Sequence, residues 1–88
     1  MEGNLVDVLA KIYVTLKESV LDPQGAAVSH ALHALRYDTV SDVRIGKYME
    51  VTLSAGSEQE AHQLVRGMCD QLLTNPVIEK YTYELVEA

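Results

Sequence analysis

The chain has 88 residues, a length that accommodates one domain, and its 13 acidic and seven basic residues give a net charge of −6. This acidic balance opposes binding to a nucleic-acid backbone. The single cysteine, Cys69, excludes an internal disulfide framework and favours the cytoplasm, and no apolar stretch approaches the ~20 residues of a membrane span.

The first predicted element is a half-buried strand that begins at Leu9. Its side chains alternate, so that Ile12, Val14 and Leu16 fall on one face while Tyr13 and Thr15 fall on the other. Residues 1–8 are weakly patterned, and we expect them to be an N-terminal extension that frays.

A helix is predicted next, from Pro23 to about Leu35. Asp22 precedes it as an N-cap, and Pro23 suits the first helical position because its missing N–H would have no partner there. The predicted apolar side of this helix consists of Val28, Ala31, Leu32 and Leu35.

Two strands follow in the prediction, Tyr37–Ile45 and Tyr48–Leu53, joined by a tight turn at Gly46-Lys47. The second of these strands directs Met49, Val51 and Leu53 inward.

A second helix is predicted from Glu58 to about Thr74, because Ser57 to Glu60 has the form of a capping box. Its apolar stripe consists of Ala61, Leu64, Val65, Met68 and Leu72. Pro76 follows its end, and a last strand is predicted from Tyr81 to Val86.

The predicted order β-α-β-β-α-β indicates an α+β chain with a ferredoxin-like fold. We expect a four-stranded antiparallel sheet with both helices on one face, formed by one chain or by strands shared between two chains. The uncovered face is expected to be buried in an oligomer or complex, the alternative being a solvated face. It would carry Tyr13, Thr15, Lys17, Asp42, Arg44, Tyr48, Glu50 and Thr52, and the oligomer contacts are expected at Tyr13, Thr15, Tyr48, Glu50 and Thr52.

No local group of residues supports catalysis or metal binding. Cys69 lies in mid-helix beside Asp70, whereas a reactive thiolate prefers a helix N-terminus or a cationic neighbour. His30 and His33 lack a third local ligand. We therefore expect no catalytic residue and no metal site, and interpret the chain as a binding or assembly domain.

Four segments carry a resemblance to a known family. They are Val20-Leu21-Asp22-Pro23-Gln24-Gly25, Asp42-Val43-Arg44-Ile45-Gly46-Lys47, Met68-Cys69-Asp70 with Leu72-Leu73, and Asn75-Pro76-Val77-Ile78-Glu79-Lys80-Tyr81. In their order and spacing the chain resembles the PurS family over nearly its whole length, from about Ala10 to Leu85. Position 36 departs from the family pattern, because Arg36 stands where the family usually has the glycine that ends the first helix.

The resemblance implies the role of a non-catalytic small subunit of phosphoribosylformylglycinamidine synthase in purine biosynthesis. Such a subunit forms homo-oligomers, dimers or tetramers, and bridges a large synthase subunit and a glutaminase subunit so that ammonia passes between their sites. It implies no cofactor for this chain, with ATP and magnesium on the large subunit. The alternative is a small-molecule-sensing regulatory module of the ACT type, which shares the predicted order of elements.

Three clusters are predicted to contact the partner subunits. They are Asp22, Pro23, Gln24 and Gly25; Arg44, Gly46 and Lys47; and Asn75 with Pro76. Each also has a purely structural interpretation: helix capping for the first, turn geometry for the second and helix termination for the third. Arg44 is the most informative, since an arginine on a sheet face can bind a carboxylate across an interface.

Overall fold

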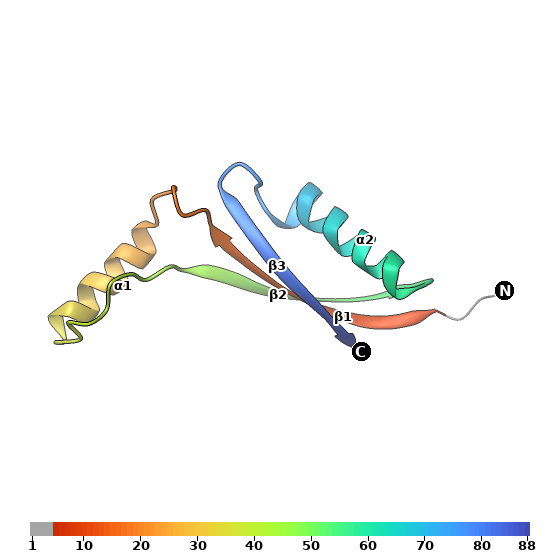
Figure 1. Ribbon diagram of the computed structural model, residues 1–88, viewed down its shortest axis with the longest axis horizontal. Coiled ribbons are helices and arrows are strands. Elements are labelled where there is room, and N and C mark those ends of the chain that lie inside the picture. The colour runs from red at the N-terminus through yellow and green to blue at the C-terminus, as the bar shows by residue number, and fades with distance from the viewer. Residues whose placement is uncertain (1–4) are drawn as a thin grey trace.

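The computed structural model describes residues 5–88, which form an α+β structure with a three-stranded antiparallel sheet in the order β2-β1-β3 (Figure 1). The elements are β1 (Val6–Leu16), α1 (Pro23–Ala34), β2 (Gly46–Ala55), α2 (Glu58–Met68), the π-helical turn η1 (Cys69–Leu73) and β3 (Glu79–Glu87). Residues 1–4 of the predicted extension lie outside the described residues, and β1 begins at Val6 instead of Leu9.

The centre of the sheet is β1, whose alternating pattern produces the expected two faces. Val8, Ala10, Ile12 and Val14 point inward and are at most 5% exposed. Both neighbouring strands pair with β1 in antiparallel register, with Ile12 opposite Met49 of β2 and Tyr83 of β3. The inner face of β1 therefore forms one side of the hydrophobic core.

The other side of this core is formed by α2 and its continuation η1, which pack on the sheet. Ser57 is the N-cap of α2, and its hydroxyl accepts a hydrogen bond from the Glu60 N–H (3.1 Å), as the capping box predicts. Val65 and Cys69 are fully buried against β1. The helix ends in a wider π turn, where the N–H and the hydroxyl of Thr74 both donate to the Cys69 carbonyl (3.0 and 2.8 Å).

The first helix, α1, begins and ends as the sequence predicts. Asp22 caps its N-terminus, and Leu35 is its C-cap. Arg36 follows with φ 76°, the left-handed conformation that glycine adopts without strain. The N–H groups of Arg36 and Tyr37 donate to the carbonyls of His33 and Leu32 (both 3.0 Å), which is the hydrogen-bond pattern of a Schellman motif.

The predicted fourth strand is wrong in this structure. Residues 37–45 form no strand, and Gly46-Lys47 forms no hairpin turn, because the chain runs from this segment into β2 without reversing (Figure 1). A tight hairpin turn needs a residue with positive φ, and Gly46 does not have one. The ferredoxin-like sheet of four strands is therefore incomplete within one chain.

The prediction that both helices cover one face of the sheet is also wrong. Only α2 packs on the sheet, whereas α1 and residues 35–45 project from its end as an arm (residues 23–45) (Figure 1). Val28 and Leu35, predicted on the apolar side of this helix, are 40% and 68% exposed because no element among residues 5–88 covers α1. Leu64 and Leu72 of the predicted α2 stripe are also exposed, at 41% and 82%.

Candidate functional site

The three predicted contact clusters lie together at one corner of the molecule, where the arm leaves the sheet. The corner consists of the loop 17–22, the first turn of α1, the start of β2 and the turn 75–78 that leads into β3. The Lys17 N–H donates to the Ile78 carbonyl (2.8 Å), so that two loops about sixty residues apart in the sequence are joined here. We treat this corner as the candidate functional site.

Asp22 holds the base of the arm together through both oxygens of its carboxylate. Oδ1 accepts from the Gly25 N–H and Oδ2 accepts from the Ile45 N–H, both at 2.8 Å, and the residue is 5% exposed. The hydrogen bonds from Ile45 and Gly25, with a further contribution from the Arg44 charge, lower the pKa of this carboxyl below its ordinary value of 3.8. Asp22 is therefore a structural cap that also ties α1 to the chain entering β2.

Gly25 is required beside this cap for a different reason. A Cβ at this position would lie 2.1 Å from the Val43 carbonyl oxygen, so only glycine lets α1 approach residues 35–45 this closely. The two halves of the arm thus pack as one body.

Arg44 fixes the direction of the arm. Its Nη2 group donates to the carbonyls of Lys17 (2.9 Å) and Val20 (3.1 Å), with a longer contact to that of Leu16 (3.5 Å). These carbonyls belong to the last residue of β1 and to the loop that follows it, so the guanidinium group joins the arm to the end of the central strand. Arg44 precedes β2 and does not lie on the sheet face where the sequence pattern placed it.

The third cluster, Asn75 with Pro76, is connected to the second through Glu79. Oδ1 of Asn75 accepts from the Val77 N–H (3.1 Å), and the Asn75 N–H donates to Oε1 of Glu79 (2.7 Å). Oε2 of Glu79 lies 3.7 Å from Nζ of Lys47. Glu79, which was not predicted as a site residue, thereby links the turn to the start of β2.

Two open clefts flank Asp22 at this corner, of about 410 and 400 Å³. The first is lined by Val14, Thr15, Leu16, Asp22, Pro23, Gln24, Ile45, Gly46, Lys47 and Glu79. The second is lined by Glu18, Ser19, Val20, Leu21, Asp22, Ala26, Asp42, Val43 and Arg44. The first cleft therefore brings together members of two predicted clusters.

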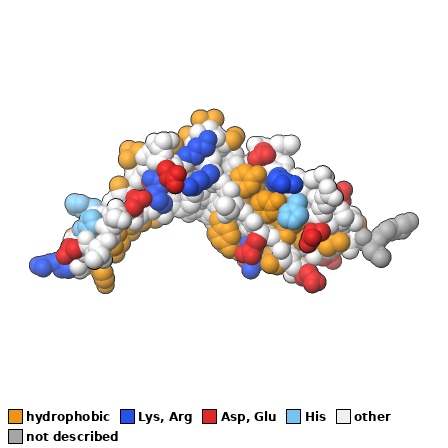
Figure 2. Space-filling model, viewed as in Figure 1, with side chains coloured by type: hydrophobic (Ala, Val, Ile, Leu, Met, Phe, Trp, Pro, Cys, Tyr) orange, Lys and Arg blue, Asp and Glu red, His pale blue; other side chains and the backbone are white. Residues whose placement is uncertain are grey.

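Apolar side chains project from the two loops of the corner. Leu21 is 78% exposed and Val77 is 77% exposed, and neither was predicted as a contact residue. Figure 2 shows hydrophobic side chains along the top of the molecule together with Lys and Arg side chains below them. The sequence could have indicated these two residues, because a large apolar side chain in a short loop between elements has little core to pack into.

The outer face of the sheet carries five of the eight residues that the sequence pattern placed there, namely Tyr13, Thr15, Tyr48, Glu50 and Thr52. The prediction is wrong for Lys17, Asp42 and Arg44, which lie outside the strands. Tyr13 and Tyr48 are directly opposite in the register, and their ring centroids are 5.0 Å apart. The Tyr48 hydroxyl donates to Glu50 (2.8 Å), and this bond, with the nearby negative charge, raises the pKa of Tyr48 to about 12. Both rings are nearly half exposed, so this is an amphipathic surface that none of the described elements covers.

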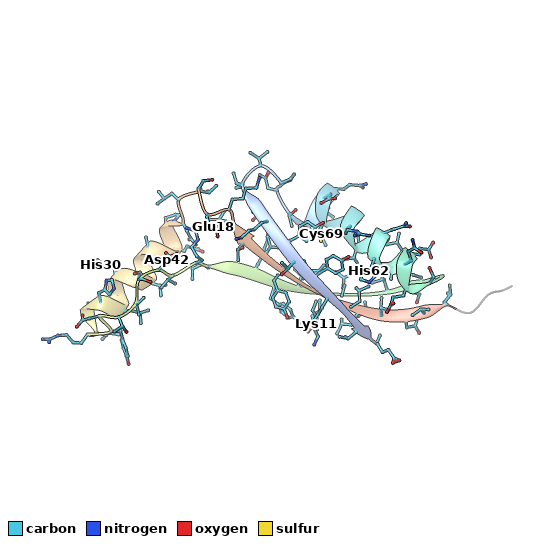
Figure 3. The ribbon with its side chains drawn as sticks, viewed as in Figure 1. Lys11, Glu18, His30, Asp42, His62 and Cys69 are labelled. Atoms are coloured by element: carbon cyan, nitrogen blue, oxygen red, sulfur yellow. The ribbon has the colours of Figure 1, made fainter. Side chains whose placement is uncertain are left out.

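The described residues contain no arrangement suited to nucleophilic or metal chemistry. Cys69, the first residue of η1, is fully buried against β1, and burial, followed by the charge of Asp70, raises the pKa of its thiol (Figure 3). His30 lies on the arm, whereas His62 lies on α2 with its Nδ1 2.9 Å from the Tyr83 hydroxyl oxygen (Figure 3). Within residues 5–88 no group of three His, Cys, Asp or Glu side chains could hold a metal ion, and no helix is long and apolar enough to cross a bilayer.

Comparison with known proteins gives one consistent result. The family model described as PurS, phosphoribosylformylglycinamidine (FGAM) synthase, matches residues 9–87. The chain is 60% identical over 77 residues to phosphoribosylformylglycinamidine synthase subunit PurS of Bacillus subtilis, a match that covers 88% of this chain and 90% of that protein. The corresponding subunit of Synechocystis is 59% identical over 75 residues, which cover 85% of this chain and 75% of that protein.

Solved structures agree with the sequence comparison. A crystal structure of B. subtilis PurS superimposes with a TM-score of 0.79 at 57% identity, covering 91% of this chain and 99% of that one. A chain of the PurLQS structure from Thermotoga maritima superimposes with a TM-score of 0.80 at 29% identity, covering 93% and 98%.

Proposed function

The chain belongs to the PurS family of small subunits of phosphoribosylformylglycinamidine synthase, and from this premise we propose that it acts as a docking subunit between the catalytic subunits of that complex. The Thermotoga relative is a component of a structure named PurLQS, which supports partnership with two further kinds of subunit. The corner is the surface that we assign to this docking.

In the proposed complex the chemistry belongs to the partners. A glutaminase subunit releases ammonia from glutamine, and a large subunit uses ATP, with magnesium, to convert formylglycinamide ribonucleotide to formylglycinamidine ribonucleotide. This chain aligns the two so that ammonia passes between them and does not escape. The buried thiol of Cys69 accords with a subunit that supplies no nucleophile.

The observation that carries the docking proposal is the convergence of the three clusters at the corner. Asp22, Arg44 and Glu79 each make at least two hydrogen bonds or ion pairs there, so the loops are held in one conformation before a partner arrives. A preorganised loop loses little conformational entropy on binding. The exposed Leu21 and Val77 provide apolar area for a partner to bury.

The outer sheet face is the second surface in the proposal. Tyr13 and Tyr48 form an aromatic pair bordered by Thr15, Glu50 and Thr52, a mixture typical of interfaces. We assign this face to contacts between copies of the chain in a homo-oligomer, which leaves the corner available for the catalytic subunits.

The test uses Leu21→Glu, because this side chain is exposed and its loss leaves the hydrogen bonds of the corner intact. Leu5→Glu is the matched control, since Leu5 is 67% exposed at the opposite end of the sheet. Purified large and glutaminase subunits are mixed with each variant, and complex formation is measured by sedimentation velocity. Leu21→Glu should weaken assembly by roughly tenfold or more, as expected for a hot-spot residue, while Leu5→Glu should assemble normally. Equal assembly by both variants would contradict the assignment of the corner as the surface that binds the catalytic subunits.

A further inference from the structure

The free edge of β3 carries a row of backbone groups that face away from the sheet. In the order β2-β1-β3 no strand lies beyond β3 among residues 5–88. The Ala88 N–H donates to the Asp7 carbonyl (3.2 Å) and the Lys17 N–H donates to the Ile78 carbonyl (2.8 Å), and both pairs continue the register of β1 with β3. Because residues of an antiparallel strand face its two neighbours alternately, the even-numbered residues of β3 bond to β1 and the odd-numbered ones face outward.

The outward-facing residues of this edge are Tyr81, Tyr83, Leu85 and Glu87. No hydrogen bond within residues 5–88 uses their backbone N–H or carbonyl groups. The strand is nine residues long, contains no proline and pairs with β1 without a bulge. Proteins usually protect an exposed edge with a bulge, a proline or an inward-pointing charge, and the stretch from Tyr81 to Leu85 has none of these.

The inner side of β3 presents two tyrosine rings that are fixed in place but only partly buried. The helix α2 lies closest to β1 and β2, and side chains bridge the remaining distance to β3. The Tyr81 hydroxyl donates to Asp70 (3.2 Å), and the Tyr83 hydroxyl oxygen lies 2.9 Å from Nδ1 of His62. The ring centroids of Tyr81 and Tyr83 are 6.4 Å apart. A strand added beside β3 would therefore cover a preorganised aromatic surface.

The position and the charge of this edge indicate which kind of strand fits it. Glu79, the first residue of β3, accepts from the Asn75 N–H and pairs with Lys47, so the edge begins in the corner assigned to the catalytic subunits. The strand carries three glutamates and one lysine, and that residue, Lys80, is paired with Glu18 (3.4 Å). A second copy would bring the same acidic strand, whereas a strand with Lys or Arg side chains is complementary.

We propose that an extended segment of a catalytic subunit binds the free edge of β3 as an additional strand of the sheet. This inference rests on the proposed function and names what the partner presents to the chain. The segment continues from the corner along β3, with apolar side chains against the tyrosine rings and a basic side chain near Glu84. Backbone hydrogen bonds to the four outward-facing residues hold it over roughly 20 Å.

Amide hydrogen exchange tests the added strand directly. The isotopically labelled chain is placed in heavy water alone or with unlabelled large and glutaminase subunits, exchange is quenched, and the remaining amide protons are measured by NMR. In the isolated chain the N–H groups of Tyr81, Tyr83, Leu85 and Glu87 should exchange quickly, because nothing bonds to them. In the complex the same four groups should exchange roughly tenfold or more slowly.

Two results of this experiment would overturn the inference. One is exchange of the four N–H groups at the same rate in the complex as in the isolated chain. The other is slow exchange already in the isolated chain, which would mean that a second copy occupies the edge. The even-numbered residues Thr82 and Glu84, which face β1, are the internal control and should exchange slowly in both samples.

A proline substitution tests the same edge through assembly. Leu85→Pro removes an outward-facing N–H and places its ring where the added strand would bind, while every bond to β1 remains. Leu85→Ala is the matched control, because it loses the same side chain and keeps the N–H. In sedimentation velocity with both catalytic subunits, Leu85→Pro should assemble roughly tenfold or more weakly than Leu85→Ala. Equal assembly would contradict the added strand.

A second pair of variants covers the case in which Leu85→Pro fails to fold. Glu87 is exposed and is the last residue of β3, so Glu87→Pro leaves the core unchanged. It should also assemble more weakly than its control, Glu87→Ala, and equal assembly would again contradict the added strand.

The outcomes separate the added strand from the proposed function. If the unaltered chain assembles and Leu21→Glu weakens assembly, while the four N–H groups stay unprotected, the corner stands and the added strand is overturned. If the unaltered chain binds neither catalytic subunit, the proposed function fails and the added strand fails with it.

Discussion

At the scale of single residues, the base of the arm depends on two charged groups that are satisfied within the chain. The carboxylate of Asp22 accepts from two N–H groups, and the guanidinium group of Arg44 donates to the carbonyls that follow β1. Without these two side chains, backbone N–H and carbonyl groups would lack hydrogen-bond partners where α1, β1 and β2 meet. Substitution of either should loosen the corner as a whole.

Asp22 gives this corner a pH dependence whose sign follows from its lowered pKa. A carboxyl that titrates lower in the folded state than in the unfolded state stabilises the fold above its unfolded pKa, near 3.8, and loses this effect as the pH falls through the folded pKa. Asp22→Asn should therefore lower the urea midpoint most above about pH 5, and the difference from the unaltered chain should shrink below pH ~4. Asp38→Asn, at an exposed position in the arm, is the control. A constant difference across this range would contradict the role of the charge.

Arg36 provides a second prediction at this scale. A side chain at φ 76° costs roughly 1 kcal/mol relative to glycine, so Arg36→Gly should raise the free energy of unfolding by about that amount. Arg36→Ala removes the same charge but keeps the Cβ, and it should give no such gain. Urea unfolding of the three chains measures the effect, and equal stabilisation by both variants would refute the backbone explanation.

The accuracy of prediction at single residues depended on how local each interaction is. The cap at Asp22 and the left-handed residue at Arg36 are set by neighbours within four positions, and the structure has both. The bond from Asp22 to Ile45 and the clamp made by Arg44 join segments more than twenty positions apart. No sequence pattern specifies such a pairing, so Arg44 was expected on the sheet face.

At the scale of elements, the two helices show why burial is harder to predict than helix formation. In α2 a polar face opposes a stripe that includes Ala61 and Val65, and this stripe lies on β1 as expected. In α1 alanine, serine and histidine surround the helix, so its amphipathic character is weak. The pattern could define where α1 begins and ends, but not which surface covers it.

The close contact between α1 and residues 35–45 is testable at this scale. Gly25→Ala would place a Cβ 2.1 Å from the Val43 carbonyl oxygen, so the arm must open or shift, and we expect a loss of roughly 2 kcal/mol in the free energy of unfolding. Gly67→Ala is the matched control, because a Cβ there meets nothing within 4 Å and alanine is the better helix former. It should stabilise the chain by up to about 1 kcal/mol. Similar effects of the two substitutions in denaturant unfolding would contradict the packing of the arm.

For the whole molecule, the sequence predicted which helices and strands form better than it predicted how the chain runs between them. Every predicted element except the strand at residues 37–45 is present, with the sheet order β2-β1-β3. The hairpin expected at Gly46-Lys47 rested on the turn preference of glycine, but Gly46 lies against β1, where a Cβ would come 2.3 Å from the Val14 carbonyl oxygen. Glycine is used there for close approach, a use that a sequence pattern does not distinguish from a turn.

In the proposed function this chain supplies no catalytic residue and couples the catalytic subunits by binding both of them. The coupling is measured as product formation by the large and glutaminase subunits, with and without this chain, using glutamine or free ammonia as the nitrogen source. Adding the chain should raise the glutamine-dependent rate by roughly tenfold or more, with little change in the ammonia-dependent rate. Equal use of glutamine and ammonia by the two catalytic subunits in the absence of this chain would contradict it.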